Sequence, residues 1–310
     1  MAHTRSRKRR GRRTLCREVP SIVPVLTDGA HFARMRSYRS FAFDDHRSYL
    51  RQLEGLLRAL TAQQVHARVV LFDPVDYELF CEEEKLDPDT PSSRARYVSE
   101  VASAGTAMPY RGEAIEQLLP QLREAHASRL TWQSGAEVLA RAGSCARCGT
   151  DIGKAAFDRA ARALALVLET AGDGTHHLVG SVAVPGTPLV TALDVRRTSQ
   201  GELHARESAA LALTTALAAG FATGSSGGLV LRTDAGADDG DLTAGSGAAQ
   251  DVVRGWSLDP PRCWLRPLTA AEVFTAYCTD PATREPLAPE PGVDHAPGFA
   301  LPHPGGDLHC

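Results

Sequence analysis

The sequence predicts an α/β protein with an N-terminal doubly wound, Rossmann-like parallel sheet, followed by a smaller antiparallel α+β domain. The first observation is the run Val69–Phe72, which is apolar and β-rich without alternation, as in a strand buried on both faces of a parallel sheet. The second is that helical patterns flank this run, as a βαβ unit requires. The third is a change after residue 172 to paired β-rich segments joined by short turns, a pattern typical of hairpins.

Length and composition place the chain among soluble globular proteins. It has 310 residues, of which 43% are hydrophobic and 23% charged. No apolar run approaches the ~18 residues of a membrane span, and Pro20 and Pro24 interrupt the first hydrophobic segment, which argues against a secretory signal. The seven cysteines are odd in number and scattered, which argues against a disulfide framework. We therefore expect a reduced, cytoplasmic protein without a membrane partner.

The N-terminus is a basic arm. Residues 1–17 contain eight arginine or lysine residues and no acid, whereas the whole chain has a formal net charge of −3, so the remainder is acidic. Without apolar periodicity, residues 1–20 are expected to be disordered. The arm could bind nucleic acid through its phosphates, or an acidic partner; it could equally be a solvated tail or fold back on the acidic body. Its basic residues are Arg5, Arg7, Lys8, Arg9, Arg10, Arg12, Arg13 and Arg17.

Three strands are expected in an α/β domain spanning residues 21–127. They are Ile22–Leu26, Val69–Phe72 and Thr106–Tyr110, with helices between them. This order is that of a doubly wound sheet with right-handed crossovers.

Capping residues and apolar periods indicate the helices of this domain. Tyr49–Leu60 carries one apolar stripe on a 3.6-residue period, and Asp44 or Asp45 can cap it. Thr90-Pro91 opens another helix, with threonine as the cap and proline in the first turn. The aromatic segment Phe32–Phe43 is irregular and is expected to form a loop.

The rest of the chain divides into three parts. Residues 128–172 are expected to form a helical connector, residues 173–280 an α+β domain with two hairpins, and residues 281–310 a tail rich in proline and glycine. Within the α+β domain, Glu207–Ala219 predicts a helix with Gly220 as its C-terminal cap. Thr233–Gln250 is acidic, rich in glycine and without an apolar pattern, so we expect a mobile loop.

A candidate ligand site lies at the carboxyl ends of two predicted strands, where Asp28 and Asp73 stand. If the strands are neighbours, the two carboxylates could hold Mg²⁺ for a phosphorylated small molecule or a nucleotide. His31, Asp76 and Arg111 could reach the same edge. The alternative is that Asp-Gly and Asp-Pro form turns in which the carboxylate bonds its own backbone.

Cys145-x-x-Cys148-Gly is half of a zinc site or a redox pair. A closed zinc site needs four ligands, and the sequence has no second Cys-x-x-Cys. A redox pair opens a helix after a strand, and no suitable strand precedes this motif. The pattern favours two reduced structural cysteines, with metal and redox roles as alternatives.

Two function classes therefore stay open. The first is an enzyme or ligand-binding protein that uses the edge at Asp28 and Asp73. The second is a non-enzymatic regulatory or nucleic-acid-associated protein that uses the basic arm.

Overall fold

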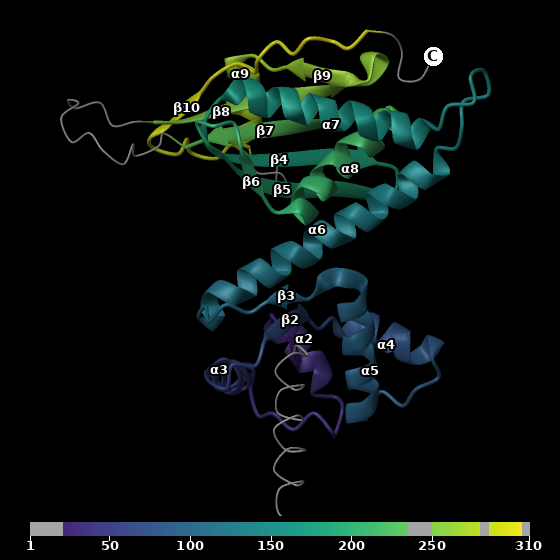
Figure 1. Ribbon diagram of the computed structural model, residues 1–310, viewed down its shortest axis with the longest axis vertical. Helices are drawn as coiled ribbons and strands as arrows, with labels where there is room; N and C mark the ends of the chain where they lie inside the picture. Colours follow the sequence, from purple (N-terminus) through teal and green to yellow (C-terminus); the bar gives the residue numbers. More distant parts are fainter. Residues whose placement is uncertain (1–20, 235–249, 280–284, 306–310) are drawn as a thin grey trace, which may run out of the picture. The chain divides into compact units, whose positions relative to one another are not determined.

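The computed structural model describes residues 21–234, 250–279 and 285–305. The chain forms two compact units, residues 1–126 and 127–310, each with its own apolar core (Figure 1). Helix α6, Ile115–Arg141, contains the boundary. The predicted arm and nearly all of the predicted loop Thr233–Gln250 lie outside the described residues.

The first unit contains a three-stranded mixed sheet in the order β1-β2-β3. Strands β1, Ser21–Val25, and β2, Ala67–Leu71, pair in parallel, whereas β3, Met108–Pro109, runs antiparallel to β2. The α/β class is confirmed, but the described residues form no Rossmann-like parallel sheet. Two successive helices, α4 (Pro74–Glu83) and α5 (Pro91–Val101), separate β2 from β3. Strand β3 begins opposite Val69 and runs back towards the amino end of β2.

The helices of the first unit begin at side-chain caps. Asp45 accepts the backbone N–H of Ser48, and Thr90 accepts that of Ser93, so both predicted helix starts are confirmed. The segment expected to be a loop is helical in its first part, because Asp28 caps a short helix that buries Phe32 and Met35 one turn apart. The helices are α2, Gly29–Met35; α3, His46–Ala62; α4, Pro74–Glu83; and α5, Pro91–Val101.

The second unit contains a mostly antiparallel sheet in the order β10-β8-β7-β4-β5-β6, with β9 also paired to β8. The two predicted hairpins, β4–β5 and β8–β9, are both present. Gly186, at φ 95°, occupies the position after Pro185 in the two-residue β4–β5 turn, where a type II turn needs a positive φ. The strands are β4, Gly174–Val184; β5, Thr187–Arg197; β6, Leu203–Ala205; β7, Gly227–Thr233; β8, Asp251–Asp259; β9, Trp264–Pro267; and β10, Val293–His295.

Helices α7, Ile152–Ala171, and α8, Glu207–Thr223, pack with this sheet around the main core of the unit (Figure 1). The predicted cap at Gly220 is wrong, because α8 continues for three more residues and ends at Gly224, which has φ 64°. Gly220 serves packing instead, since a β-carbon there would meet Leu258. Helix α9, Ala270–Tyr277, begins at a capping box formed by Thr269 and Glu272.

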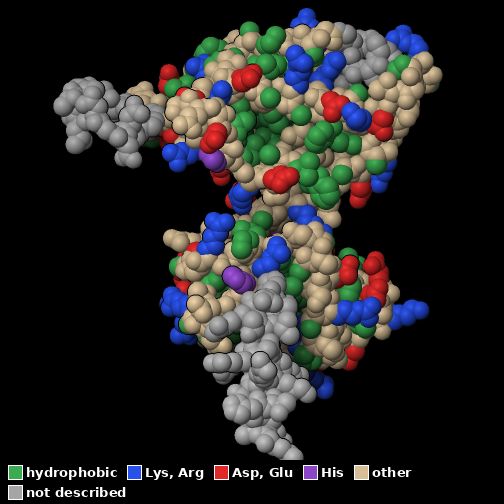
Figure 2. Space-filling model, in the orientation of Figure 1, with side chains coloured by type: hydrophobic (Ala, Val, Ile, Leu, Met, Phe, Trp, Pro, Cys, Tyr) green, Lys and Arg blue, Asp and Glu red, His purple; other side chains and the backbone are tan. Residues whose placement is uncertain are grey.

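Part of the segment predicted as a tail packs on the second unit. Strand β10 runs parallel to β8, and the carbonyl oxygens of Phe299 and Leu301 accept the indole N–H groups of Trp256 and Trp264. Figure 2 shows hydrophobic side chains among charges of both signs on one face of this unit. Among the described residues, none of the helices combines the length and the apolar character that crossing a membrane requires.

Candidate ligand-binding site

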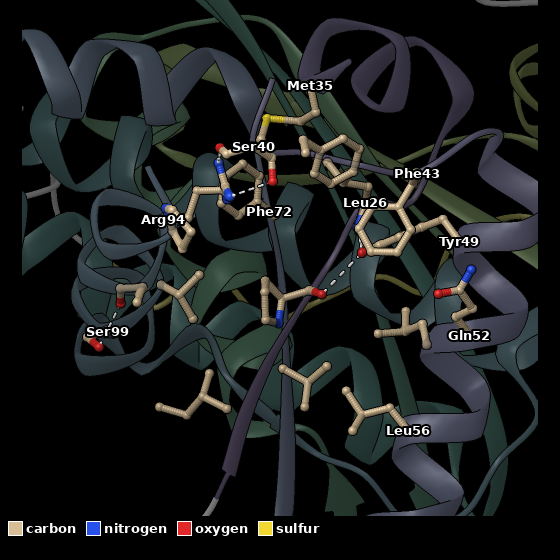
Figure 3. Close-up of a pocket in the computed structure, with 18 residues that line it drawn as sticks. Leu26, Met35, Ser40, Phe43, Tyr49, Gln52, Leu56, Phe72, Arg94 and Ser99 are labelled. Carbon is tan, nitrogen blue, oxygen red and sulfur yellow. Dashed lines mark hydrogen bonds between the residues drawn. The ribbon is translucent and has the colours of Figure 1, made fainter. Parts of the chain in front are cut away.

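A pocket of about 800 Å³ lies in the first unit beside β1, the edge strand of the sheet (Figure 3). Helix α3 supplies one wall and α5 the other. The lining is predominantly apolar, as in sites for small organic ligands, which have volumes of roughly 300–1,000 Å³. Its apolar side chains include Val23, Pro24, Phe43, Leu53, Leu56 and Val98.

The pocket lies at the edge of β1 that does not pair with β2, where helix α3 packs in place of another strand. The strand bonds β2 through alternate residues, so the backbone groups of Ile22, Pro24 and Leu26 point the other way. Pro24 has no N–H to donate. The Tyr49 hydroxyl donates to the Pro24 carbonyl at 3.3 Å and accepts the Leu26 N–H at 3.2 Å. Burial raises the pKa of Tyr49 to about 12, so the hydroxyl stays protonated and can donate.

Aromatic rings close the end of the pocket near the carboxyl end of β1. The Phe43 ring contacts Phe41 and Tyr49, with centroids 4.9 and 5.1 Å away, and Phe32 lies 5.5 Å from Phe41. These edge-on and tilted contacts are favourable between rings. They hold the segment after α2 in place as the closed end of the pocket.

Among the described residues that line the pocket, Arg94 is the only one with a charged side chain. Its guanidinium donates to the hydroxyl of Ser40 at 2.8 Å and to the Ser40 carbonyl at 3.2 Å. Figure 3 shows Arg94 and Ser40 at one side, near Met35 and Phe72, with Phe43 opposite. A guanidinium has five N–H donors, so two bonds to Ser40 leave it the capacity to bind an anionic oxygen.

Asp89 holds the backbone that presents Ser40. Its carboxylate accepts the N–H groups of Arg39 and Ser40 at 3.0 and 2.8 Å. These bonds to Ser40, and the smaller effect of Arg94, lower the pKa of Asp89. The carboxylate therefore stays ionised at neutral pH and orients the Ser40 side of the Ser40–Arg94 contact.

The residues predicted for the strand ends are only partly brought together. Asp28 and Asp73 do follow neighbouring parallel strands, as the magnesium hypothesis requires. However, each carboxylate caps a helix: Asp28 accepts the N–H of His31 at 2.8 Å, and Asp73 accepts that of Val75 at 2.8 Å. His31 also places a ring nitrogen 3.0 Å from Asp28. Asp76 lies in the first turn of α4.

Other charged groups at this edge are paired with one another. Arg34 forms an ion pair with Glu78, which also accepts the hydroxyl of Tyr38 at 3.2 Å. Burial and Glu78 raise the pKa of Tyr38 to about 12, and Arg34 lowers that of Glu78. A ring nitrogen of His126 lies 4.0 Å from Asp73.

Arg111 does not reach this edge. It follows Tyr110, whose N–H bonds the carbonyl of Ala67, so it lies at the amino end of β2. In the part of the chain that the structure describes, no group of three or more His, Cys, Asp or Glu side chains could hold a metal ion. Cys145 and Cys148 lie in the α6–α7 connection of the second unit, and the basic residues of the arm lie outside the described residues.

The pocket residues Ser40, Tyr49 and Arg94 were not predicted. The start of α5 at Thr90 is visible in the sequence, but Arg94 and Arg96 look equivalent there. Only the structure separates them, because Arg94 lines the pocket whereas Arg96 pairs with Glu84. The grouping of aromatic residues in Phe32–Phe43 is the one sequence signal that points to this site.

Residues 10–113, about a third of the chain, match the model of a domain of unknown function (DUF8829). This match contains every residue that lines the pocket. A comparison with curated proteins and one with solved structures found no match to this chain.

Proposed function

We propose that the first unit binds a small amphipathic molecule in the pocket beside β1. The apolar body of the ligand packs between α3 and α5, and its anionic group binds Arg94. A carboxylate, a sulfonate and a phosphate all suit a guanidinium, so a phosphorylated ligand is included. The observation that carries the proposal is that the described residues lining this mostly apolar pocket of about 800 Å³ include one cation, Arg94, and no other charged side chain.

The position of the pocket also supports ligand binding. Its lining includes Leu26 and Phe72, the residues next to the carboxyl ends of β1 and β2. Ligands of open α/β sheets bind outside the carboxyl ends of parallel strands. The Asp89 bonds to the Arg39–Ser40 backbone hold part of the polar end in place before a ligand arrives, which lowers the entropy cost of binding.

Two fluorescent probes of nearly the same shape test the proposal. The first is 1-anilinonaphthalene-8-sulfonate, which carries an anion, and the second is uncharged N-phenyl-1-naphthylamine. Arg94→Gln should weaken binding of the sulfonate by about tenfold or more, because a charge-assisted bond contributes about 1.5–3 kcal/mol. The same variant should change binding of the uncharged probe by much less.

Arg96→Gln is the matched control, since Arg96 is on the same helix and does not line the pocket. Ala95→Phe places a ring in the pocket and leaves the Arg94–Ser40 contact in place, so it should reduce binding of both probes. Equal effects of Arg94→Gln and Arg96→Gln on the sulfonate would contradict the proposal.

The basic arm supports a second candidate function, nucleic-acid binding. Eight cationic residues within residues 1–17 would contact phosphates without reading bases. Binding of a short random-sequence duplex should then weaken steeply as salt is raised from 50 to 200 mM, by roughly 10³-fold or more if most of these residues engage. Deletion of residues 1–17 should abolish it, and binding that survived the deletion would rule out the arm as the site.

A further inference from the structure

Gln52 is a second polar group of the pocket in the first unit, on the wall opposite Arg94. Its side chain extends from α3 next to Tyr49, whereas Arg94 and Ser40 lie across the pocket (Figure 3). The side-chain amide carries two N–H donors and a carbonyl acceptor. Gln52 is exposed, and no hydrogen bond joins its side chain to another of the described residues. A bound molecule can therefore use the full hydrogen-bonding capacity of this amide.

The open edge of β1 adds backbone groups to the pocket. Of the residues that point away from β2, Pro24 and Leu26 bond the Tyr49 hydroxyl. Ile22 also points away from β2 and lines the pocket. Within the described part of the chain, β1 pairs with no other strand on this side, so the N–H and carbonyl of Ile22 face an open edge. Such edge groups bind a partner that both donates and accepts hydrogen bonds.

The direction of α3 places Gln52 on the Ile22 side of Tyr49. Tyr49, near the start of α3, bonds the carboxyl half of β1. The carbonyl of His66, which follows α3, accepts the N–H of Ser21 at the amino end of β1 at 2.8 Å. Helix α3 therefore runs from the carboxyl end of β1 towards its amino end, and Gln52 lies about 4.5 Å further along than Tyr49. The Gln52 amide and the Ile22 backbone together form the neutral polar end of the pocket.

Arg94 belongs to the other end of the pocket. Its guanidinium bonds Ser40 near Phe72, the residue that follows β2 (Figure 3). Most of the remaining lining is apolar and includes Val23, Leu53, Leu56 and Val98. The pocket therefore combines an anion-binding end with a neutral polar end.

We propose that the ligand of this pocket carries an anion such as a carboxylate at one end and a hydroxyl or an amide at the other, joined by an apolar chain or ring. This assignment rests on the proposed function, since Arg94 binds the anion there. The hydroxyl or amide donates to the Gln52 side-chain carbonyl and accepts an N–H from Gln52 or Ile22. An apolar far end would displace water from these groups without replacing its hydrogen bonds, which lowers affinity. The neutral polar end thus selects bifunctional acids over plain acids of the same length.

Two matched chains, dodecanoate and 12-hydroxydodecanoate, test this inference by displacing 1-anilinonaphthalene-8-sulfonate from the full-length protein. Shorter and longer pairs of the same kind identify the chain length that spans the pocket. At that length, Gln52→Leu should weaken binding of the hydroxy acid by about threefold to tenfold, the effect of one hydrogen bond between neutral groups. The plain acid should bind the variant at least as tightly as it binds wild type, because leucine adds an apolar contact.

Gln117→Leu is the matched control, since Gln117 is an exposed glutamine on α6 of the first unit that does not line the pocket. It should leave binding of both acids unchanged. If wild type bound neither the sulfonate nor either acid, this inference and the proposed function would both be overturned. If both acids displaced the sulfonate and Gln52→Leu affected them equally, the proposed function would stand and the bifunctional ligand alone would be overturned.

Discussion

The two units bury side chains against their sheets in different ways. In the first, α3 and α5 flank an edge strand and leave a pocket of about 800 Å³ beside it. In the second, α8 lies so close to the sheet that a β-carbon on Gly180 would come within 2.5 Å of a Leu213 methyl group. Alanine and glycine allow this close approach, because they add little or nothing beyond the backbone. Side-chain size at the contact therefore decides whether a helix seals a sheet or leaves space beside it.

The nature of the facing groups adds to this difference. The second unit buries a continuous face of small and aliphatic side chains, including Ala212, Ala216 and Ala219 of α8. In the first unit, Tyr49 extends from α3 to the backbone of β1 and acts as a spacer with a polar end. The apolar face of the second unit favours stability of the fold, and the spacer in the first unit favours a ligand site.

The largest effect is expected from a single methyl group placed in the tight interface. Gly220→Ala should destabilise the protein by about 1–3 kcal/mol, because the new β-carbon meets Leu258 and Val182 within the core. Gly55→Ala is the matched control on α3, where a β-carbon finds nothing within 4 Å. It should stabilise by roughly 0.5–1 kcal/mol through helix propensity alone. Urea unfolding of both variants measures the difference, and a loss of the same size at both positions would break the comparison.

The contrast between Gly220 and Gly224 shows what the sequence could establish. Both glycines follow an alanine-rich helical pattern, and the preference for glycine at the C-terminal end of a helix predicts that the helix ends at Gly220. The structure ends α8 at Gly224, which has the left-handed conformation, whereas Gly220 lies inside the helix and packs against Val182 and Leu258. Periods and caps therefore predict that a helix exists, whereas contacts between distant segments decide where it ends.

The same limit applies to the first sheet and to the site. The strands at β1 and β2 were predictable because their apolar runs are local signals. The direction of β3 was not, because it depends on how α4 and α5 return the chain. The roles of Ser40 and Arg94 depend on a contact across 54 residues of sequence, which no local pattern reveals.

The second largest loss of stability is expected from removal of the Tyr49 hydroxyl in the first unit. Tyr49→Phe removes the partner of both the Pro24 carbonyl and the Leu26 N–H, so we expect a loss of about 1–2 kcal/mol in unfolding free energy. Tyr110→Phe is the control, since the hydroxyl of half-buried Tyr110 bonds one carbonyl, that of Glu113, among the described residues. An equal loss in the two variants would contradict a special role for the edge of β1.

A smaller effect is expected at the ends of β1 and β2. Asp28→Asn and Asp73→Asn should each change stability by less than about 1 kcal/mol, because asparagine is as good a helix cap as aspartate. If capping is the role of these carboxylates, Mg²⁺ should bind wild type and both variants equally weakly in titration calorimetry. Tight binding to wild type that either variant loses would establish the magnesium site instead.

The smallest effect is expected at the cap of α9, outside the tightly packed interface of α8. The Glu272 carboxylate accepts the Thr269 N–H at 2.8 Å and pairs with Arg266, and these bonds lower its pKa from 4.5 to about 2. A carboxyl group with a lowered pKa in the folded state stabilises the protein above pH 4.5, and this contribution is lost as the pH falls towards 2. Glu272→Gln keeps an oxygen acceptor for the cap but removes the charge. The variant should therefore be slightly less stable than wild type at pH 7, and the difference should shrink steadily below pH 4.5.

Glu169→Gln, an exposed position on α7, provides the control for loss of one negative charge. Denaturant unfolding of all three proteins at pH 7, 4 and 3 separates the local cap from a general charge effect. Because Glu272 is exposed, solvent screens its ion pair, so its loss should cost far less than Gly220→Ala. A loss of unfolding free energy in Glu272→Gln as large as that in Gly220→Ala would contradict this expectation. The cap of α9 would then contribute as much to the stability of the second unit as the packing of α8 on the sheet. The contrast between the two units would need another cause.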